Sequence, residues 1–250
     1  MPPLGLHMTI ARDLAAELRS PVVDAERGAY YLGSTTPDIR VLTRCDRADT
    51  HFFDLHDFGD QDGVHRLLER EPALRDASSL DAQTAAFVAG YISHLVLDED
   101  YICQIYRPLF GERSPLREEA LADVMDKALQ YDVDMSERQD AARVDEIRLA
   151  LAEAAVEVNV GFIAQETLQQ WRDISLDVFS QPPSVERFAR FISRRLAHVD
   201  LADEEGMARF VEEIPGLLRR TWDHVGEERV REYLYETQCR ALSAMKEYLS

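Results

Sequence analysis

The segment between Ser79 and Pro108 constrains the fold of this chain most, because residues 86–98 are apolar on nearly every side of a helix. They read AlaPheValAlaGlyTyrIleSerHisLeuValLeuAsp. Ser79 and Asp81 are residue types that begin helices, and Pro108 with Gly111 marks the end. A helix that lacks a polar face is buried on all sides. We therefore expect this helix at the centre of a helical bundle.

The N-terminal third also favours helices, with one irregular stretch. Ile10, Leu14, Ala15 and Leu18 form one apolar stripe at helical spacing. A short helix is expected over residues 24–32, with Gly33 as the glycine that follows its C-terminus. Residues 33–63 contain many turn-forming residues, and we interpret them as mostly loop.

The remainder predicts further helices and no strands. They are expected to start near Ser114 and after Ser136, and then to cover roughly residues 184–199, 203–213 and 216–249. The helix after Ser136 meets no breaker except Gly161 before Gln181. The prediction is an all-α, multi-helix bundle of one domain over residues 1–250, with a metal-binding core in 1–111 and additional helices in 112–250.

Composition excludes several classes of function. The net charge is -19, from 47 acidic and 28 basic residues, so the surface repels nucleic-acid phosphates and anionic membranes. No apolar run is long enough to insert stably in a membrane, and the N-terminal segment has no signal-peptide pattern. The three cysteines form no disulfide framework. A cytoplasmic protein is expected, and the sequence indicates no oligomeric state.

The expected central helix also carries chemistry, in His94 and Asp98. A spacing of four residues places both side chains on one face, about 6 Å apart at Cβ, where an imidazole and a carboxylate can bind one divalent ion. A buried charge is costly unless it is paired or metal-bound. Gly90 lies one turn earlier and allows another backbone to approach, and Tyr91 and Tyr101 flank this face as phenol donors.

Four short motifs, taken in order, resemble the zinc-dependent phospholipase C family of bacteria, whose metal core is shared by the fungal single-strand nucleases. They are LeuHisMetThrIleAla at 6–11, TyrLeuGlySerThrThrProAsp at 31–38, ThrHisPhePheAsp at 50–54 and GlyTyrIleSerHisLeuValLeuAsp at 90–98. The resemblance covers roughly residues 1–110. It implies the family's helical fold, with the metal site between the N-terminal segments and the central helix.

The resemblance also implies a ligand set. Asp38, His51, His94 and Asp98 correspond to the ligands of a first zinc, and His7 to a ligand of a second zinc that Asp98 bridges. The family's third zinc uses histidines that follow the helix pair, whereas this chain has no histidine between His94 and His198. We therefore expect one or two zinc ions and no third.

One or two ions can activate water and polarise a phosphoryl oxygen. The predicted function is a hydrolase of phosphoric esters, acting on a small phosphoester or a phospholipid head group. Asp38 is the expected catalytic residue and orients the water. Arg40 and Arg107 are expected to stabilise charge, and Asp54 to orient His51 by a hydrogen bond.

Two alternatives stay open. In the first, the ligands hold a structural metal in a protein without catalytic activity, and residues 112–250 form a partner-binding surface. In the second, the adjacent pair His56 and Asp57 marks an HD-type phosphohydrolase, although its neighbours predict a loop where that family has a helix. In the favoured interpretation His56 is a pocket residue.

Overall fold

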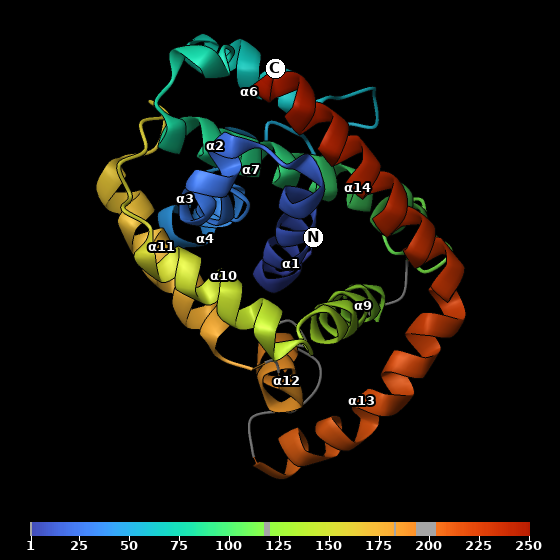
Figure 1. Ribbon diagram of the computed structural model, residues 1–250. Helices are drawn as coiled ribbons and strands as arrows, with labels where there is room; N and C mark the ends of the chain where they lie inside the picture. The colour runs from blue at the N-terminus through green and yellow to red at the C-terminus, as the bar shows by residue number, and fades with distance from the viewer. Residues whose placement is uncertain (1, 118–120, 183, 194–203) are drawn as a thin grey trace.

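The computed structural model describes residues 2–117, 121–182, 184–193 and 204–250 and contains no strand within them (Figure 1). The predicted all-α fold is confirmed. The elements are α1 (Leu4–Leu18), α2 (Pro21–Ala25), α3 (Arg27–Gly33), η1 (Thr36–Ile39), α4 (Arg40–Thr43), α5 (Ala48–His51), α6 (Gly63–Arg70), η2 (Pro72–Leu74), η3 (Ala77–Ser79), α7 (Ala82–Asp100), η4 (Tyr101–Tyr106), α8 (Arg107–Leu109), α9 (Ala122–Glu137), α10 (Ala141–Glu153), α11 (Gln165–Ser180), α12 (Val185–Ser193), α13 (Glu204–Val225) and α14 (Glu227–Leu249).

The long apolar helix is α7, and its position confirms the prediction. Asp81 caps its N-terminus by accepting a hydrogen bond from the backbone N–H of Thr84 at 2.8 Å, which satisfies a donor that the helix itself cannot use. Nearly every residue from Thr84 to Asp98 is buried. Helices α3 and α14 pack on it, and α14 crosses the molecule from α13 to the C-terminus beside α6 (Figure 1).

Two glycines allow the backbones of α3 and α7 to come into direct contact where the helices cross. A Cβ atom on Gly90 would lie 2.0 Å from the carbonyl oxygen of Tyr30, and a Cβ atom on Gly33 would lie 2.0 Å from that of Phe87. The expected backbone approach at Gly90 is confirmed. Gly33 differs from the prediction, because it is the last residue of α3 and lacks a positive φ. Its role is close packing on α7.

The irregular stretch 33–63 contains more helix than predicted. Pro37 lies in the first turn of η1, which continues into α4, and α5 follows after a short break. Proline favours the first turn of a helix because its φ is already helical. The predicted helix over 24–32 is interrupted at Glu26, which separates α2 from α3. Within the stretch that was expected to be loop, the longest part without helix is residues 52–62.

The helix predicted after Ser136 is two helices, α10 and α11, joined by an extended segment at 154–164. Val156, Val158 and Val160 are buried there while the residues between them are exposed. This alternation of apolar and polar residues is typical of extended backbone and is visible in the sequence.

Two expected boundaries in the C-terminal part also differ. Helix α13 continues through Pro215 to Val225, and the break lies at Gly226, whose φ is +82°. Glycine adopts this left-handed backbone without a Cβ clash. The helix expected over 184–199 is described only to Ser193, and His198 lies outside the described residues.

The apolar core is continuous between the N-terminal and C-terminal parts. Side chains of α1, α7, α10, α11 and α14 share one buried cluster, and a smaller cluster lies between α9, α12 and α13. The division at residue 111 stays a prediction. Within the described part of the chain, no helix combines the length and apolarity that crossing a bilayer requires.

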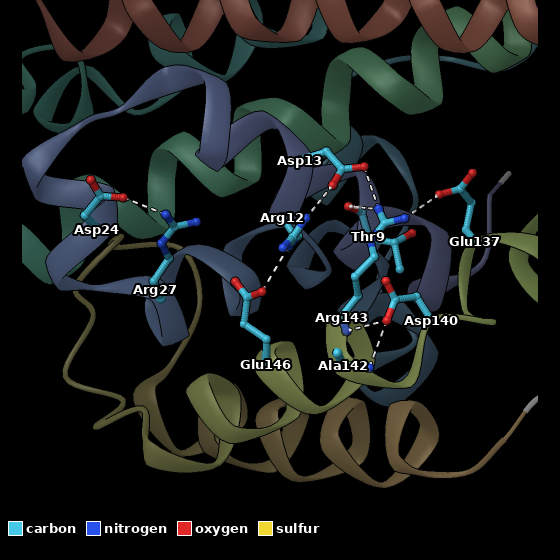
Figure 2. A network of polar contacts seen from close by, with 10 residues as sticks. All are labelled: Thr9, Arg12, Asp13, Asp24, Arg27, Glu137, Asp140, Ala142, Arg143 and Glu146. Carbon is cyan, nitrogen blue, oxygen red and sulfur yellow. Dashed lines mark hydrogen bonds and ion pairs between the residues drawn. The ribbon is translucent and has the colours of Figure 1, made fainter.

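Polar contacts fix α1 against α10 (Figure 2). Arg12 donates to Glu146 at 3.1 Å, and Arg143 donates to Asp13 at 2.5 Å and to the carbonyl oxygen of Thr9 at 3.5 Å. These side chains are partly exposed, so each pair contributes little free energy. They join α10 to α1, the helix that carries His7.

Candidate metal centre

The five predicted ligands converge from four elements. His7 lies in α1, Asp38 in η1, His51 in α5, and His94 and Asp98 one turn apart in α7. Two groups of possible ligand atoms each lie within 4.8 Å of one another: His7, His94 and Asp98, and Asp38, His51 and His94. Residues more than 90 positions apart in the sequence therefore meet at one face of α7.

Asp98 lies at the middle of the cluster. Its Oδ2 atom is 3.2 Å from Nε2 of His51 and 3.7 Å from Nε2 of His94, and its Oδ1 atom is 3.5 Å from Nε2 of His7. The Oδ1 atom of Asp38 is 3.5 Å from Nε2 of His51. Charge-assisted hydrogen bonds are shorter, about 2.7–2.9 Å. Ligands at about 2.1 Å from a tetrahedral zinc lie about 3.4 Å apart, which these distances match.

The other nitrogen of two histidines is held by the protein. Nδ1 of His94 lies 2.8 Å from the carbonyl oxygen of Ser34, so it donates there and leaves Nε2 as the free lone pair. Nδ1 of His51 lies 3.1 Å from Oγ1 of Thr50. The rings of His7 and His94 stack with centroids 3.7 Å apart. Metal-binding histidines commonly have this support on the nitrogen that faces away from the ion.

Several buried atoms in the cluster lack a hydrogen-bond partner, which is the strongest sign that the residues fit a metal. They are Nε2 of His51 and His94, both ring nitrogens of His7, and Oδ1 of Asp98. The four side chains are at most 2% exposed. An unpaired buried polar atom costs about 1–3 kcal/mol. A divalent ion bound to these atoms would remove most of that cost.

The electrostatics favour the protonation states that bind metal. Burial, and then the proximity of His94, lowers the pKa of His7 to about 4, so its imidazole is neutral at pH 7. Desolvation raises the pKa of Asp38, but the contact with His51 and the charge of His94 outweigh it, and the pKa falls to about 2. Desolvation of Asp98 is likewise outweighed by its three histidines, which hold its pKa well below the usual range. Both carboxylates are therefore ionised at neutral pH.

Arg47 was not predicted and belongs to the site. Its Nη2 atom donates to Oδ2 of Asp98 at 2.9 Å, and its side chain is 14% exposed. The only sequence signal was its position four residues before His51, on the short helical turn that presents both side chains.

The aromatic residues around His51 anchor its segment. Phe52 is buried against Tyr91 and Phe162, with ring centroids 6.4 and 5.8 Å apart. The buried hydroxyl of Tyr91 donates to the carbonyl oxygen of Thr50. Tyr91 thus acts on the site through the backbone beside His51.

Two residues that were expected near the metal form their hydrogen bonds with other parts of the protein. Tyr101 donates to Asp126 at 2.6 Å, because α9 brings that buried carboxylate against it. Arg107 donates to the carbonyl oxygens of Asp54, Leu55 and Asp57, so it holds the 52–62 loop instead of facing the metal ligands.

The expected role of Asp54 is also wrong. The side chain of Asp54 accepts from the backbone N–H of His56, while the two nitrogens of His51 face Thr50 and the carboxylates of Asp38 and Asp98. No position on His51 is left for Asp54.

His56 is not a pocket residue, because its side chain is 78% exposed and lies 3.8 Å from Glu112. With Asp57 it lies in the loop, as the sequence predicted, and no helix presents the pair. The HD-type alternative therefore has no geometric support. Arg40 is partly exposed, its buried Nε atom has no hydrogen-bond partner, and its role stays a prediction.

Comparison with curated proteins and with solved structures gives no match. Comparison with protein families gives a match to the model described as zinc dependent phospholipase C, over residues 6–99. These residues include all five converging side chains and Arg47. The resemblance to the zinc-dependent phospholipase C family is thus confirmed over residues 6–99 of this chain.

Proposed function

We propose that this protein is a zinc-dependent hydrolase of phosphoric esters, with His7, Asp38, His51, His94 and Asp98 as metal ligands. The observation that carries the proposal is the convergence of ligand atoms from four elements, at distances typical of ligands around one ion, where the atoms from α1, α5 and α7 are buried and unpartnered. The family match supports the choice of zinc and of a phospholipase-like reaction. One or two ions remain the expected number, and the cytoplasm the expected compartment.

The reaction uses the open edge of the cluster. A bound zinc ion supplies a Lewis acid that activates water and polarises a phosphoryl oxygen. Asp38 is 17% exposed, whereas the other four ligand side chains are at most 2% exposed. Substrate therefore reaches the site beside Asp38. Its low pKa keeps the carboxylate ionised, so it accepts a hydrogen bond from the attacking water and orients it.

The expected substrates are phosphodiesters with a small leaving group, including the head-group ester of a phospholipid. The supporting observations are the family match and the cationic Arg47 beside the ligands. An assay with bis(p-nitrophenyl) phosphate, p-nitrophenyl phosphate and short-chain phosphatidylcholine compares a diester, a monoester and a lipid. We expect the diester and the lipid to be hydrolysed faster than the monoester.

The decisive experiment combines metal content and turnover in wild type, His94→Ala and the control His65→Ala. His65 is exposed and pairs with Glu69 one turn away. Wild type and the control should hold zinc and hydrolyse the diester, while His94→Ala should lose both. If zinc-loaded wild type hydrolyses none of the three substrates, the proposed hydrolase activity is refuted.

A structural metal is the second candidate, favoured by the near-complete burial of the cluster and by its four source elements. Such an ion would fasten α1, η1 and α5 to α7. Metal removal separates the two functions. A chelated protein that stays folded at room temperature and loses turnover contradicts the structural function, whereas unfolding on chelation of a zinc-loaded protein that shows no turnover supports it.

A further inference from the structure

Arg47 is only partly satisfied by the protein. Its Nη2 atom donates to Asp98, but its Nε and Nη1 atoms are both buried and have no hydrogen-bond partner. A guanidinium group has five donors in a fixed planar fork. Leaving charged donors buried without acceptors is more costly than leaving neutral ones. The arrangement is explained if an acceptor lies at these unpartnered donors when the protein works.

The acceptor must reach Arg47 and the metal ligands together. Arg47 and its partner Asp98 adjoin His51, which in turn lies 3.5 Å from the partly exposed Asp38. An acceptor that enters beside Asp38 therefore meets the ligand cluster first and the guanidinium next. The five ligands contribute two negative charges through Asp38 and Asp98, and no fixed positive charge.

The neighbouring sequence supports an anion as this acceptor. Residues 38–49 contain three arginines, Arg40, Arg44 and Arg47, and three aspartates, in a chain whose net charge is -19. A segment without net charge on an acidic protein repels anions less than the rest of the surface does.

We propose that Arg47 donates to a non-bridging oxygen of the substrate phosphate through its unpartnered Nη1 atom, while its Nη2 atom holds Asp98. Nη1 and Nη2 lie side by side at the end of the planar guanidinium group, so they can serve two acceptors at once. Arg47 is then a substrate-binding residue that selects for the phosphoryl group. This inference rests on the proposed function, because it needs the phosphoester to be bound at the metal ligands.

The test measures binding of inorganic phosphate to the zinc-loaded protein by titration calorimetry, together with zinc content. The variants are Arg47→Gln, Arg47→Lys and the matched control Arg44→Gln, which removes the same charge from an exposed position in the same segment. We expect both Arg47 variants to retain zinc and to bind phosphate about 10- to 100-fold more weakly, since charge-assisted hydrogen bonds are lost. The control should change binding less than about 3-fold, as expected for a screened surface charge.

Kinetics add a second readout. In the diester assay, KM should rise in both Arg47 variants, and Arg47→Lys should recover little because one ammonium cannot replace two donors. Zinc-loaded Arg47→Gln with the phosphate affinity of the wild type would overturn the inference. Loss of zinc from both Arg47 variants would also overturn it, because Arg47 would then act only by holding Asp98.

These outcomes are distinct from failure of the proposed function. If zinc-loaded wild type neither binds phosphate nor hydrolyses any phosphoester, both the proposed hydrolase function and the inference about Arg47 are contradicted. If wild type hydrolyses the diester and the Arg47 variants match it in phosphate affinity and KM, only the inference fails.

Discussion

Gly90→Ala tests whether the backbone contact between α3 and α7 builds the metal centre. The new Cβ atom would lie 2.0 Å from the carbonyl oxygen of Tyr30 and 2.9 Å from the backbone nitrogen of Ser34. Real Cβ atoms essentially never approach closer than 3.0 Å, so the two helices must separate by about 1 Å. Both atoms in conflict are backbone, and no flexible side chain can give way.

The separation also breaks a contact that orients a ligand. Nδ1 of His94 lies 2.8 Å from the carbonyl oxygen of Ser34, and a shift of about 1 Å takes this pair beyond hydrogen-bond distance. Overpacking costs about 1–3 kcal/mol and the lost bond about 1 kcal/mol. Alanine recovers about 1 kcal/mol of helix propensity. The free energy of unfolding should fall by about 1–3 kcal/mol, which lowers Tm by about 2–12 °C in a chain of this size.

The assay is thermal unfolding together with a zinc titration. Loss of the support on His94 should weaken zinc binding about 10- to 100-fold. Gly216→Ala is the control, because its Cβ atom would meet nothing within 4 Å in the exposed part of α13, and it should leave zinc binding unchanged and stability equal or higher. Gly90→Ala with wild-type Tm and wild-type zinc affinity would refute the reasoning.

Three further predictions concern the metal and its surroundings. Zinc at about 1,000 times its dissociation constant should stabilise the protein by about 4 kcal/mol. This is measured as a rise in Tm that a chelator reverses. An unchanged Tm would contradict a metal site in the native state. Tyr91→Phe removes the donor to the buried carbonyl oxygen of Thr50. It should lower the free energy of unfolding by about 1–3 kcal/mol and weaken zinc binding. A zinc titration identical to that of the wild type would show that Tyr91 has no role in the site. Asp126→Ala leaves the hydroxyl of Tyr101 and the ammonium of Lys127 without their carboxylate, and urea unfolding at pH 7 should show a loss of about 2–4 kcal/mol. Desolvation of Asp126 is outweighed by Lys127, so the pKa of Asp126 is lowered from 3.8. The ionised carboxylate therefore stabilises the fold above that pH. The difference in unfolding free energy between wild type and Asp126→Ala should shrink as the pH falls below about 4. A difference that grows on acidification would contradict this assignment.

Zinc dependence of folding and turnover decides between the catalytic and the structural ion. The four enclosed ligands suit either function, because burial both excludes water from a reaction and joins elements of a fold. The partial exposure of Asp38 favours catalysis, since a purely structural site is closed on all sides.

The sequence alone determined the helical class and the centre of the bundle. Residues 86–98 are apolar around the whole helix, so α7 had to be buried, and its His94 and Asp98 had to share one face because their spacing is fixed by helix geometry. The motifs around His7, Asp38 and His51 supplied the other three expected ligands through the family resemblance, which requires no knowledge of contacts.

Only the tertiary structure decided which neighbours surround those ligands. Tyr91 in α7 and Tyr101 at the start of η4 look equivalent in the sequence, yet α9 places Asp126 against Tyr101 and leaves Tyr91 beside Thr50. Arg47 and Arg107 are both arginines near motif residues, yet one reaches Asp98 and the other holds the loop after His51. Helical periodicity fixes which residues share a face of one helix, whereas the partner of that face depends on how several helices pack, and here the contact of Gly33 and Gly90 with the opposite backbones sets that packing.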